Sequence, residues 1–447
     1  MKLKKKTVLI EICRFLLGTA LVLSGFFKAI DPWGSAYKID EYLGAFGLRY
    51  LTAFDLSLSF IQIALEFTVG ACLLLGIYRK RTTLLALVIM LFMTPLTLYL
   101  AFKNPISDCG CFGDALIISN WQTFFKNVVL LAAAVYLFQH KKSLVKLFSR
   151  KKYFITFLWI LFFIVGFSTY SYMNLPVIDF RPYKIGTNIK EKMEIPDGAE
   201  QSKYETTLIY SKNGVSKEFN INNYPKDDST WTFVDSRNRL IKKGYVPPIH
   251  DFTITNSHGE DITDAILDNP SYTFLLISSK IENAKDYNIL LINDIYDYAR
   301  LNGYGFYALT ASLNDDIKKW KESTAAEYPF CTTDETALKT IVRSNPGLLL
   351  IKDGIILNKW SNNKLPSKLD KPLEESRLGQ QGSNQSLQKI IITLLVLLIP
   401  LAVLYLLDKY YNREKKHGKR HGKKSNHYLD DIKKKQAKEQ YKHINQK

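Results

Sequence analysis

The sequence predicts a polytopic α-helical membrane protein with six spans and an extracytoplasmic α/β domain that is preceded by a small β-rich unit. Three observations in the 447 residues predict this architecture. Six apolar runs are each long enough to cross a bilayer as a helix. Lysine and arginine residues are concentrated in alternate connections between these runs. A long polar region with strand-like and helix-like patterns separates the fifth run from the sixth.

The distribution of basic residues sets the expected orientation of the spans. Basic clusters occur before the first run, after the second, after the fourth and after the sixth, and we expect these four segments to be cytoplasmic. Both termini are then cytoplasmic, and residues 174–389 are periplasmic. The first run is too long for a signal peptide and contains Arg14 and Lys28. The six runs cover residues 8–30, 54–77, 82–102, 117–138, 153–173 and 390–407.

Two charged residues inside the runs are candidates for an intramembrane polar pair. Glu66 is near the middle of the second run, where an ionised carboxylate is costly. Arg14 is on the first run, and helices that follow each other are antiparallel neighbours, so an Arg14–Glu66 pair is one interpretation. The alternatives are that Arg14 pairs with Glu11 or extends to the interface, and that Glu66 is protonated.

Two cysteines, Cys109 and Cys111, are one residue apart in the connection between the third and fourth runs. The predicted extracytoplasmic location allows disulfides to form. A disulfide across Gly110 closes a small, strained ring that is easily reduced, which favours thiol–disulfide exchange over a purely structural role. Asp108 and Asp114 disfavour the thiolate. A loop-structuring role remains open, whereas a metal site would need more ligands than the loop offers. We predict Cys109 and Cys111 as the catalytic pair, and no metal.

Motifs in residues 8–140 carry a resemblance to a known family. The most specific is the cysteine motif of residues 108–113. The other matching residues are Arg14, Gly18, Ser24, Gly25, Lys28, Glu66, Gly70, Gly76, Trp121 and Asn127. This part of the chain resembles the DoxX/MauE group of four-helix bacterial membrane proteins. The MauE branch is associated with cofactor and disulfide maturation of a secreted dehydrogenase. The resemblance therefore implies a redox or maturation role in the bacterial inner membrane, without implying the same client.

The polar region between the fifth and sixth runs contains two patterns. Short alternating strands before residue 247 predict the β-rich unit, and strands alternate with helices after it. The second pattern resembles the thioredoxin-like fold, with the best matches at residues 251–254 and 344–347. The resemblance places Pro346 at the position of a cis-proline. It places the redox Cys-X-X-Cys at residues 278–283, where this chain has no cysteine. We therefore expect a docking module without dithiol chemistry of its own.

Cys331 is the only cysteine of this outer domain. It precedes a predicted helix whose expected N-cap is Thr333. A helix N-terminus lowers the pKa of a thiol, so Cys331 is a candidate redox partner for the loop pair. The alternative is that Cys331 is a small buried hydrophobic residue.

The tail after the sixth run has 14 lysines and arginines against four acidic residues in residues 409–447, and the whole chain has a net charge of +18. We predict that this tail binds anionic lipid rather than nucleic acid. No nucleotide, flavin or haem motif is evident. A quinone is a suitable electron acceptor, but no residue identifies a site for it. The expected partners are the bilayer and an extracytoplasmic client or redox protein of unknown identity.

Two classes of function follow from these observations. In the first, the chain is a membrane thiol–disulfide oxidoreductase or its accessory subunit, and the outer domain docks a client. In the second, it is a non-catalytic scaffold for the assembly of envelope proteins, and its thiols are structural. The expected parts are a four-helix membrane domain (1–140), a basic link with the fifth span (141–173), the β-rich unit (174–247), the thioredoxin-like domain (248–366), a polar linker (367–389), the sixth span (390–407) and the basic cytoplasmic tail (408–447).

Overall fold

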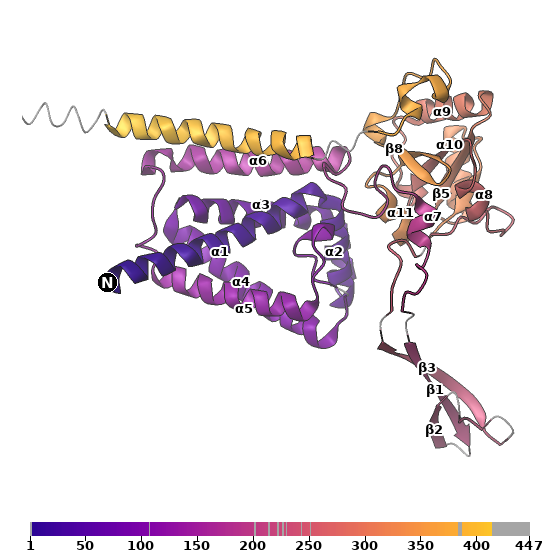
Figure 1. Ribbon diagram of the computed structural model, residues 1–447, viewed down its shortest axis with the longest axis horizontal. Coiled ribbons are helices and arrows are strands. Elements are labelled where there is room, and N and C mark those ends of the chain that lie inside the picture. The colour runs from indigo at the N-terminus through magenta and orange to yellow at the C-terminus, as the bar shows by residue number, and fades with distance from the viewer. Residues whose placement is uncertain are drawn as a thin grey trace, which may run out of the picture. The chain divides into compact units, whose positions relative to one another are not determined.

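The computed structural model contains two compact units, Met1–Phe180 with Gln385–Lys447 and Arg181–Asn384. The structure describes residues 2–413 except 107, 201–202, 213–214, 221–222, 226–227, 229, 243, 251 and 383–386. Most of the predicted basic tail therefore lies outside the described residues. Figure 1 shows both units with their helices and strands.

The first unit is built from long apolar helices. Within the described part of the chain, six helices are long and apolar enough to cross a membrane. Side chains from the first four of them form one core, which includes Leu17, Leu73, Met90 and Leu137. The six helices are α1 (Lys2–Ile30), α3 (Asp55–Leu75), α4 (Arg79–Lys103), α5 (Asn120–Gln139), α6 (Tyr153–Met173) and a last helix, Leu387–Arg413.

Glycines determine how α1 and α3 pack. A Cβ atom at Gly25 would lie 2.7 Å from the backbone nitrogen of Phe67, and one at Gly70 would lie 2.8 Å from the carbonyl oxygen of Gly18. The two backbones therefore approach closely, as small residues allow in membrane helices. This contact fixes the register, in which residues 24–28 of α1 lie beside the Glu66 turn of α3.

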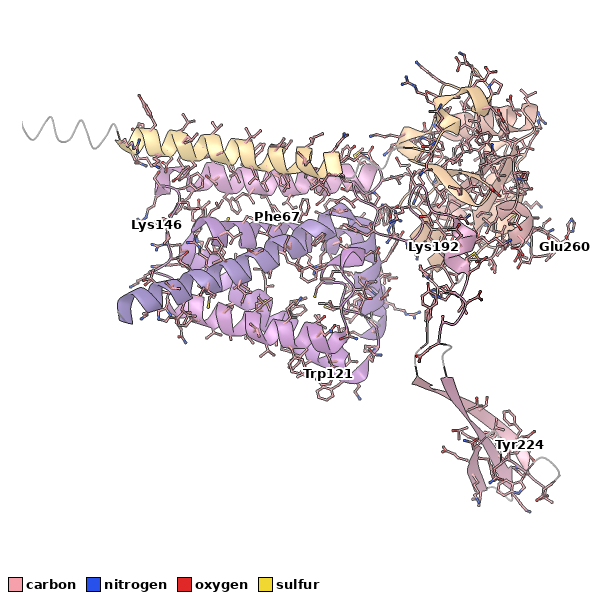
Figure 2. The ribbon with its side chains drawn as sticks, viewed as in Figure 1. Phe67, Trp121, Lys146, Lys192, Tyr224 and Glu260 are labelled. Atoms are coloured by element: carbon pink, nitrogen blue, oxygen red, sulfur yellow. The ribbon has the colours of Figure 1, made fainter. Side chains whose placement is uncertain are left out.

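Helix α6 packs against α3, and the last helix lies beside α6 in Figure 1. Phe67 of α3, labelled in Figure 2, contacts Phe163 of α6 with ring centroids 5.8 Å apart. Trp159 Nε1 of α6 donates a hydrogen bond to the carbonyl oxygen of Leu397 at 3.3 Å. The first unit therefore includes these two helices as well as the four-helix bundle.

A helix outside the apolar runs, α2 (Pro32–Ala45), was not predicted. Asp31 caps it by accepting a hydrogen bond from Gly34 N at 2.9 Å, and Pro32 occupies its first turn. A short 3₁₀ helix, η1 (Arg49–Phe54), connects α2 to α3. Helix α2 matters because it brings additional polar side chains to the cysteine loop.

The second unit contains a five-stranded mixed sheet with the order β6-β5-β4-β7-β8. Strands β4, β5 and β6 are parallel, and β7 and β8 are antiparallel to their neighbours. The strands are β4 (Tyr272–Ser278), β5 (Gly305–Thr310), β6 (Phe330–Thr332), β7 (Gly347–Lys352) and β8 (Ile355–Ser361).

Helices cover the sheet of the second unit. Ile295 of α9 and Trp320 of α10 belong to the same buried cluster as Phe274 and Leu276 of β4. Side chains alternate along a strand, so Leu275 faces the opposite side of the sheet. The helices of this unit are α7 (Ile189–Met193), α8 (Thr263–Leu267), α9 (Ile289–Leu301), α10 (Asn314–Thr324) and α11 (Glu335–Ile341).

The predicted β-rich unit corresponds to a separate three-stranded antiparallel sheet with the order β2-β1-β3. Its strands are β1 (Lys203–Lys212), β2 (Val215–Asn220) and β3 (Thr232–Lys242). Aromatic residues pack on one another across these strands; for example, the rings of Tyr210 and Phe233 have centroids 5.6 Å apart.

Candidate functional site

The two loop cysteines are in direct contact. Cys109 and Cys111 lie in the connection between α4 and α5, and their Sγ atoms are 2.9 Å apart, joined by a thiol hydrogen bond. Each residue is only 6% exposed, and both pack against Leu100 and Ile106. The pair is therefore a buried dithiol in which one sulfur donates its proton to the other.

A glycine is required between the two cysteines. Gly110 has a φ of +65°, and a Cβ atom there would lie 2.6 Å from Cγ of Lys38. The Lys38 ammonium forms an ion pair with Asp108 at 3.2 Å, and Asp108 accepts a hydrogen bond from Gly110 N at 2.8 Å. Lys38 therefore counters the negative charge of Asp108, which the sequence predicted would disfavour the thiolate.

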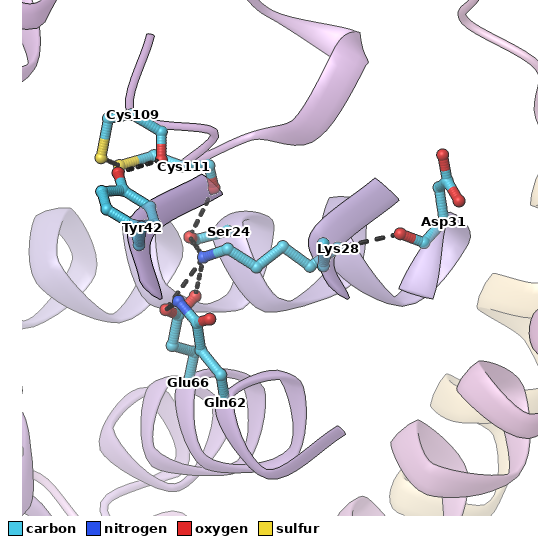
Figure 3. A network of polar contacts seen from close by, with 9 residues as sticks. Ser24, Lys28, Asp31, Tyr42, Gln62, Glu66, Cys109 and Cys111 are labelled. Atoms are coloured by element: carbon cyan, nitrogen blue, oxygen red, sulfur yellow. Dashed lines mark hydrogen bonds and ion pairs between the residues drawn. The ribbon is translucent and has the colours of Figure 1, made fainter. Parts of the chain in front are cut away.

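Neighbouring elements hold the backbone of the loop on both sides. Tyr42 of α2 donates a hydrogen bond to the carbonyl oxygen of Cys109 at 2.9 Å. Ser24 of α1 donates one to the carbonyl oxygen of Cys111 at 2.7 Å (Figure 3). Asn120 Nδ2 at the start of α5 donates to the carbonyl oxygen of Ile106 at 2.8 Å. The thiols are thus positioned by α1, α2 and α5 together.

A buried ion pair lies below the loop. Lys28 Nζ is 2.7 and 2.9 Å from the two carboxylate oxygens of Glu66, and both side chains are 5% exposed. The same ammonium donates to Ser24 Oγ at 3.0 Å, and Gln62 Nε2 donates to Glu66 at 2.9 Å. Figure 3 shows the resulting chain of contacts from Glu66 through Lys28 and Ser24 to the backbone of Cys111.

The predicted Arg14–Glu66 pair is wrong. Arg14 instead forms an ion pair with Glu11 at 3.2 Å and donates to the carbonyl oxygen of Val145 at 3.0 Å. The physical reason is the register between α1 and α3, which places Lys28 beside Glu66. Arg14 precedes Lys28 by about four turns of α1, which is about 21 Å along the helix axis at ~1.5 Å per residue.

The hydrogen bond between the thiols makes them chemically different. The bond from the Cys109 thiol lowers the pKa of Cys111 to about 6, opposed by burial and helped by the positive charges of Lys126 and Lys28. The same hydrogen bond, together with burial, raises the pKa of Cys109. Burial also raises the pKa of Tyr42, so that its hydroxyl stays a neutral donor. Cys111 is therefore the thiol of the pair that ionises more readily, and Cys109 the one that holds its proton more tightly.

The structure does not support Cys331 as a reactive thiol. It is 3% exposed in β6 of the second unit, and burial raises its pKa. Helix α11 follows only after Asp334, which caps it by accepting from Ala337 N at 2.9 Å, in place of the predicted Thr333. The charge of the helix N-terminus is therefore not available to Cys331, which acts as a small buried hydrophobic residue.

Residues 278–283, where the thioredoxin-like resemblance places a redox Cys-X-X-Cys, make hydroxyl and amide contacts instead. The peptide bond between Asn345 and Pro346 is cis. Asn345 Nδ2 donates to the carbonyl oxygen of Lys280 at 2.8 Å, and Ser278 Oγ bonds to Asn345 Oδ1 at 2.6 Å. Hydroxyl and amide groups therefore occupy this end of the sheet.

Four residues around the thiols were missed by the sequence analysis: Lys38, Tyr42, Gln62 and Lys126. The start of α2 has a readable signal, because an aspartate followed by proline is typical of a helix N-terminus. Gln62 is four residues before Glu66 on one helix face, a spacing at which side chains meet. Nothing in the sequence indicates that Lys126 lies near the loop.

Together, the apolar helices and the dithiol loop define a multi-pass membrane protein with a buried thiol pair, joined to a C-terminal sheet-containing domain. Residues 6–139, which span α1 to α5, match the family described as methylamine utilisation protein MauE. Residues 204–243 match a domain of unknown function, DUF8463. No curated protein matches the chain. The MauE match fits a membrane redox or maturation role in general terms, and the DoxX part of the resemblance stays a prediction.

Several solved structures are similar to part of the chain. One of them is the solution structure of a candidate protein disulfide isomerase from Bacteroides thetaiotaomicron, with 17% sequence identity and a TM-score of 0.22. The similarity covers 26% of this chain and 77% of that chain. A TM-score this low supports no argument about fold or activity.

Proposed function

We propose that this chain is a membrane thiol–disulfide oxidoreductase, or the accessory subunit of one, that acts on envelope proteins at the bacterial inner membrane. The observation that carries the proposal is the contact between two thiols with opposite pKa shifts on a loop held by three helices. A purely structural cysteine does not need a sulfur that ionises readily, nor a proton-donating thiol beside it.

The reaction follows from this asymmetry. In the oxidised pair, a client thiolate attacks the sulfur of Cys109, and Cys111 leaves as the thiolate because a thiol of low pKa is the better leaving group. A second client thiolate then attacks the client sulfur of the mixed disulfide and releases Cys109. The client gains a disulfide, and the loop pair takes up two electrons and becomes the dithiol.

Trapping of the mixed disulfide tests this reaction. In a Cys111→Ser variant the loop disulfide cannot form, so the mixed disulfide is reached in the reverse direction: Cys109 attacks the disulfide of an oxidised client, and one client sulfur leaves as a thiolate. No Cys111 thiolate is then present to displace the client from Cys109. We expect client adducts that run at higher mass on non-reducing gels and disappear when Cys109 is also replaced. Cys331→Ser is the matched control and should leave the adducts unchanged. The absence of adducts in the Cys111→Ser variant would contradict the proposal.

The second unit would serve as a docking module of the thioredoxin-like type. Support comes from the order of its strands and helices. The redox segment has no cysteine, and its backbone is bonded to Asn345, so the unit would hold a client without exchanging disulfides with it.

The proposed topology has six spans, cytoplasmic termini, and the cysteine loop and residues 174–389 on the extracytoplasmic side. Its support is the alternation of basic clusters. A reporter that is active only in the cytoplasm should be inactive when fused after Asn104 or after Pro196, and active when fused after Arg81. Activity after Asn104 would place the thiols on the reducing side of the membrane.

The proposed binding of the tail to anionic lipid is supported by the positive charge of the tail.

One observation favours a second function, a non-catalytic scaffold for envelope assembly. Both thiols are 6% exposed and lie in an apolar cluster, which suits a packing role. Alkylation of thiols in rapidly acidified cells separates the two functions. A redox-active pair gives a mixture of dithiol and disulfide that shifts with added oxidant, whereas a scaffold gives one constant state.

A further inference from the structure

A cavity of about 530 Å³ lies in the first unit, directly beside the dithiol. Its walls come from α1, α2, α3, α4 and the cysteine loop, and Cys109, Gly110 and Cys111 all line it. The walls are mainly apolar, with Leu43, Leu65 and Phe92 among the lining residues. Its volume falls in the range of small-molecule sites.

The apolar part of the cavity reaches the surface that membrane helices present to lipid. Ile61 of α3 is 61% exposed, and Val88 and Phe92 of α4 are 53% and 68% exposed, although all three also line the cavity. A molecule could therefore enter between α3 and α4 from the hydrocarbon region of the bilayer. Such a molecule must itself be dissolved in the membrane.

The other end of the cavity is polar. Lys28, Gln62 and Glu66 line it together with Tyr42 and the two cysteines. Their donors already have partners within the protein, Glu66 for Lys28 and Gln62, and the carbonyl oxygen of Cys109 for Tyr42. The cavity therefore combines a polar end beside the thiols with an apolar body, which suits a molecule with a polar head group and an apolar tail better than an acyl chain alone.

We propose that the cavity binds an isoprenoid quinone, with its head group against the dithiol and Lys28 and its tail between α3 and α4. The inference rests on the proposed function, because that function leaves the loop pair reduced after each client and requires an acceptor of two electrons. A quinone combines the features that the cavity matches: a planar head group with two carbonyl acceptors, and an apolar tail.

The proposed step needs one proton from water besides the loop pair and the quinone. The S–H bond of Cys109 breaks, and one S–S bond forms between Cys109 and the ionised sulfur of Cys111. The two electrons pass to the quinone together with the proton of Cys109 and the proton from water, and its two carbonyl groups become hydroxyl groups. The quinol then leaves into the bilayer through the same opening, and the loop disulfide is ready for the next client.

Val88 and Leu91 provide a matched pair of variants, because each is 53% exposed on α4 and only Val88 lines the cavity. Val88→Trp fills the cavity, whereas Leu91→Trp adds the same side chain to the lipid-facing surface. The full chain in lipid nanodiscs is labelled with a photoreactive azido-ubiquinone. In parallel, oxidation of the reduced pair by a short-tailed ubiquinone is followed by alkylation.

We expect Val88→Trp to lower both labelling and the oxidation rate at least tenfold, and Leu91→Trp to leave both within twofold of the unaltered chain. Equal behaviour of the two variants would overturn the inference. So would labelling that an isoprenoid hydrocarbon without a head group displaces as well as ubiquinone does. If client adducts form in the Cys111→Ser variant while quinone neither labels nor oxidises the chain, the quinone site fails and the proposed function stands. If ubiquinone labels α3 and α4 but no client adducts form, the quinone site stands and the proposed function fails.

Discussion

Replacing Glu66 by leucine should destabilise the first unit strongly, and replacing Lys28 by methionine in the same chain should restore most of the loss. Both side chains are 5% exposed, and the ammonium lies within 2.9 Å of both carboxylate oxygens. After removal of Glu66, the Lys28 charge would keep only the hydroxyl of Ser24, 3.0 Å away, beside a mainly apolar cavity.

The size of the effect follows from the geometry. Two unit charges at this separation attract by about 6 kcal/mol at an effective dielectric constant of ~20. Desolvation of both groups offsets much of this attraction, so the intact pair contributes little net stability. The loss of one partner leaves an uncompensated buried charge, which costs about 3–5 kcal/mol. The double replacement removes both charges and should cost at least about 2 kcal/mol less than the sum of the single replacements.

The free energy of unfolding can be measured by titrating the full chain in mixed micelles with dodecyl sulfate and following tryptophan fluorescence. The four chains of the cycle are the unaltered protein, Lys28→Met, Glu66→Leu and the double variant. Arg14→Met combined with Glu66→Leu is the control, and its effects should add because Arg14 pairs with Glu11. Additive effects for Lys28 and Glu66 would refute the assigned pair.

Two further predictions concern the loop. Cys109→Ala removes the hydrogen bond that lowers the pKa of Cys111, so the thiolate that is present above about pH 6 should require a higher pH. The pH profile of Cys111 alkylation by a small reagent should therefore shift to higher pH, and an unchanged profile would contradict the assigned donor. Gly113→Ala should cost about 1–2 kcal/mol for its φ of +54° alone, because a Cβ atom there would meet nothing nearer than 4.0 Å. Gly110→Ala should cost at least about 1 kcal/mol more through contact with Lys38, and equal thermal shifts would show that this contact is unimportant.

Local patterns in the sequence predicted most of the secondary structure. The run at residues 272–278 is β4, because seven buried apolar or hydroxyl residues in succession are typical of a central strand. The hairpin around Asp353 and Gly354 is confirmed, and both residues have the positive φ that a tight hairpin requires. These features depend on neighbours in sequence, which is why they can be read without a structure.

The arrangement of the site depends on contacts between distant segments, and these could not be predicted. Lys28 and Arg14 are both basic residues on α1, and the sequence gives no reason to prefer one as the partner of Glu66. The preference comes from the contact of Gly25 with Phe67. The pKa of Cys111 likewise depends on Lys28 and Lys126, which come from helices before and after the loop.

The charges around the dithiol explain how an acidic loop can hold a thiolate. Asp108 alone would raise the pKa of both thiols, but its carboxylate is engaged by Lys38 and by the backbone nitrogen of Gly110. Lys28 and Lys126 then act on Cys111 in the opposite direction, in addition to the hydrogen bond from Cys109. A loop that only needed to be held in place would gain nothing from this arrangement, because Tyr42 and Ser24 already bind its carbonyl groups. One set of contacts holds the loop in place and another lowers the pKa of Cys111. This separation is the strongest structural argument that the thiols react.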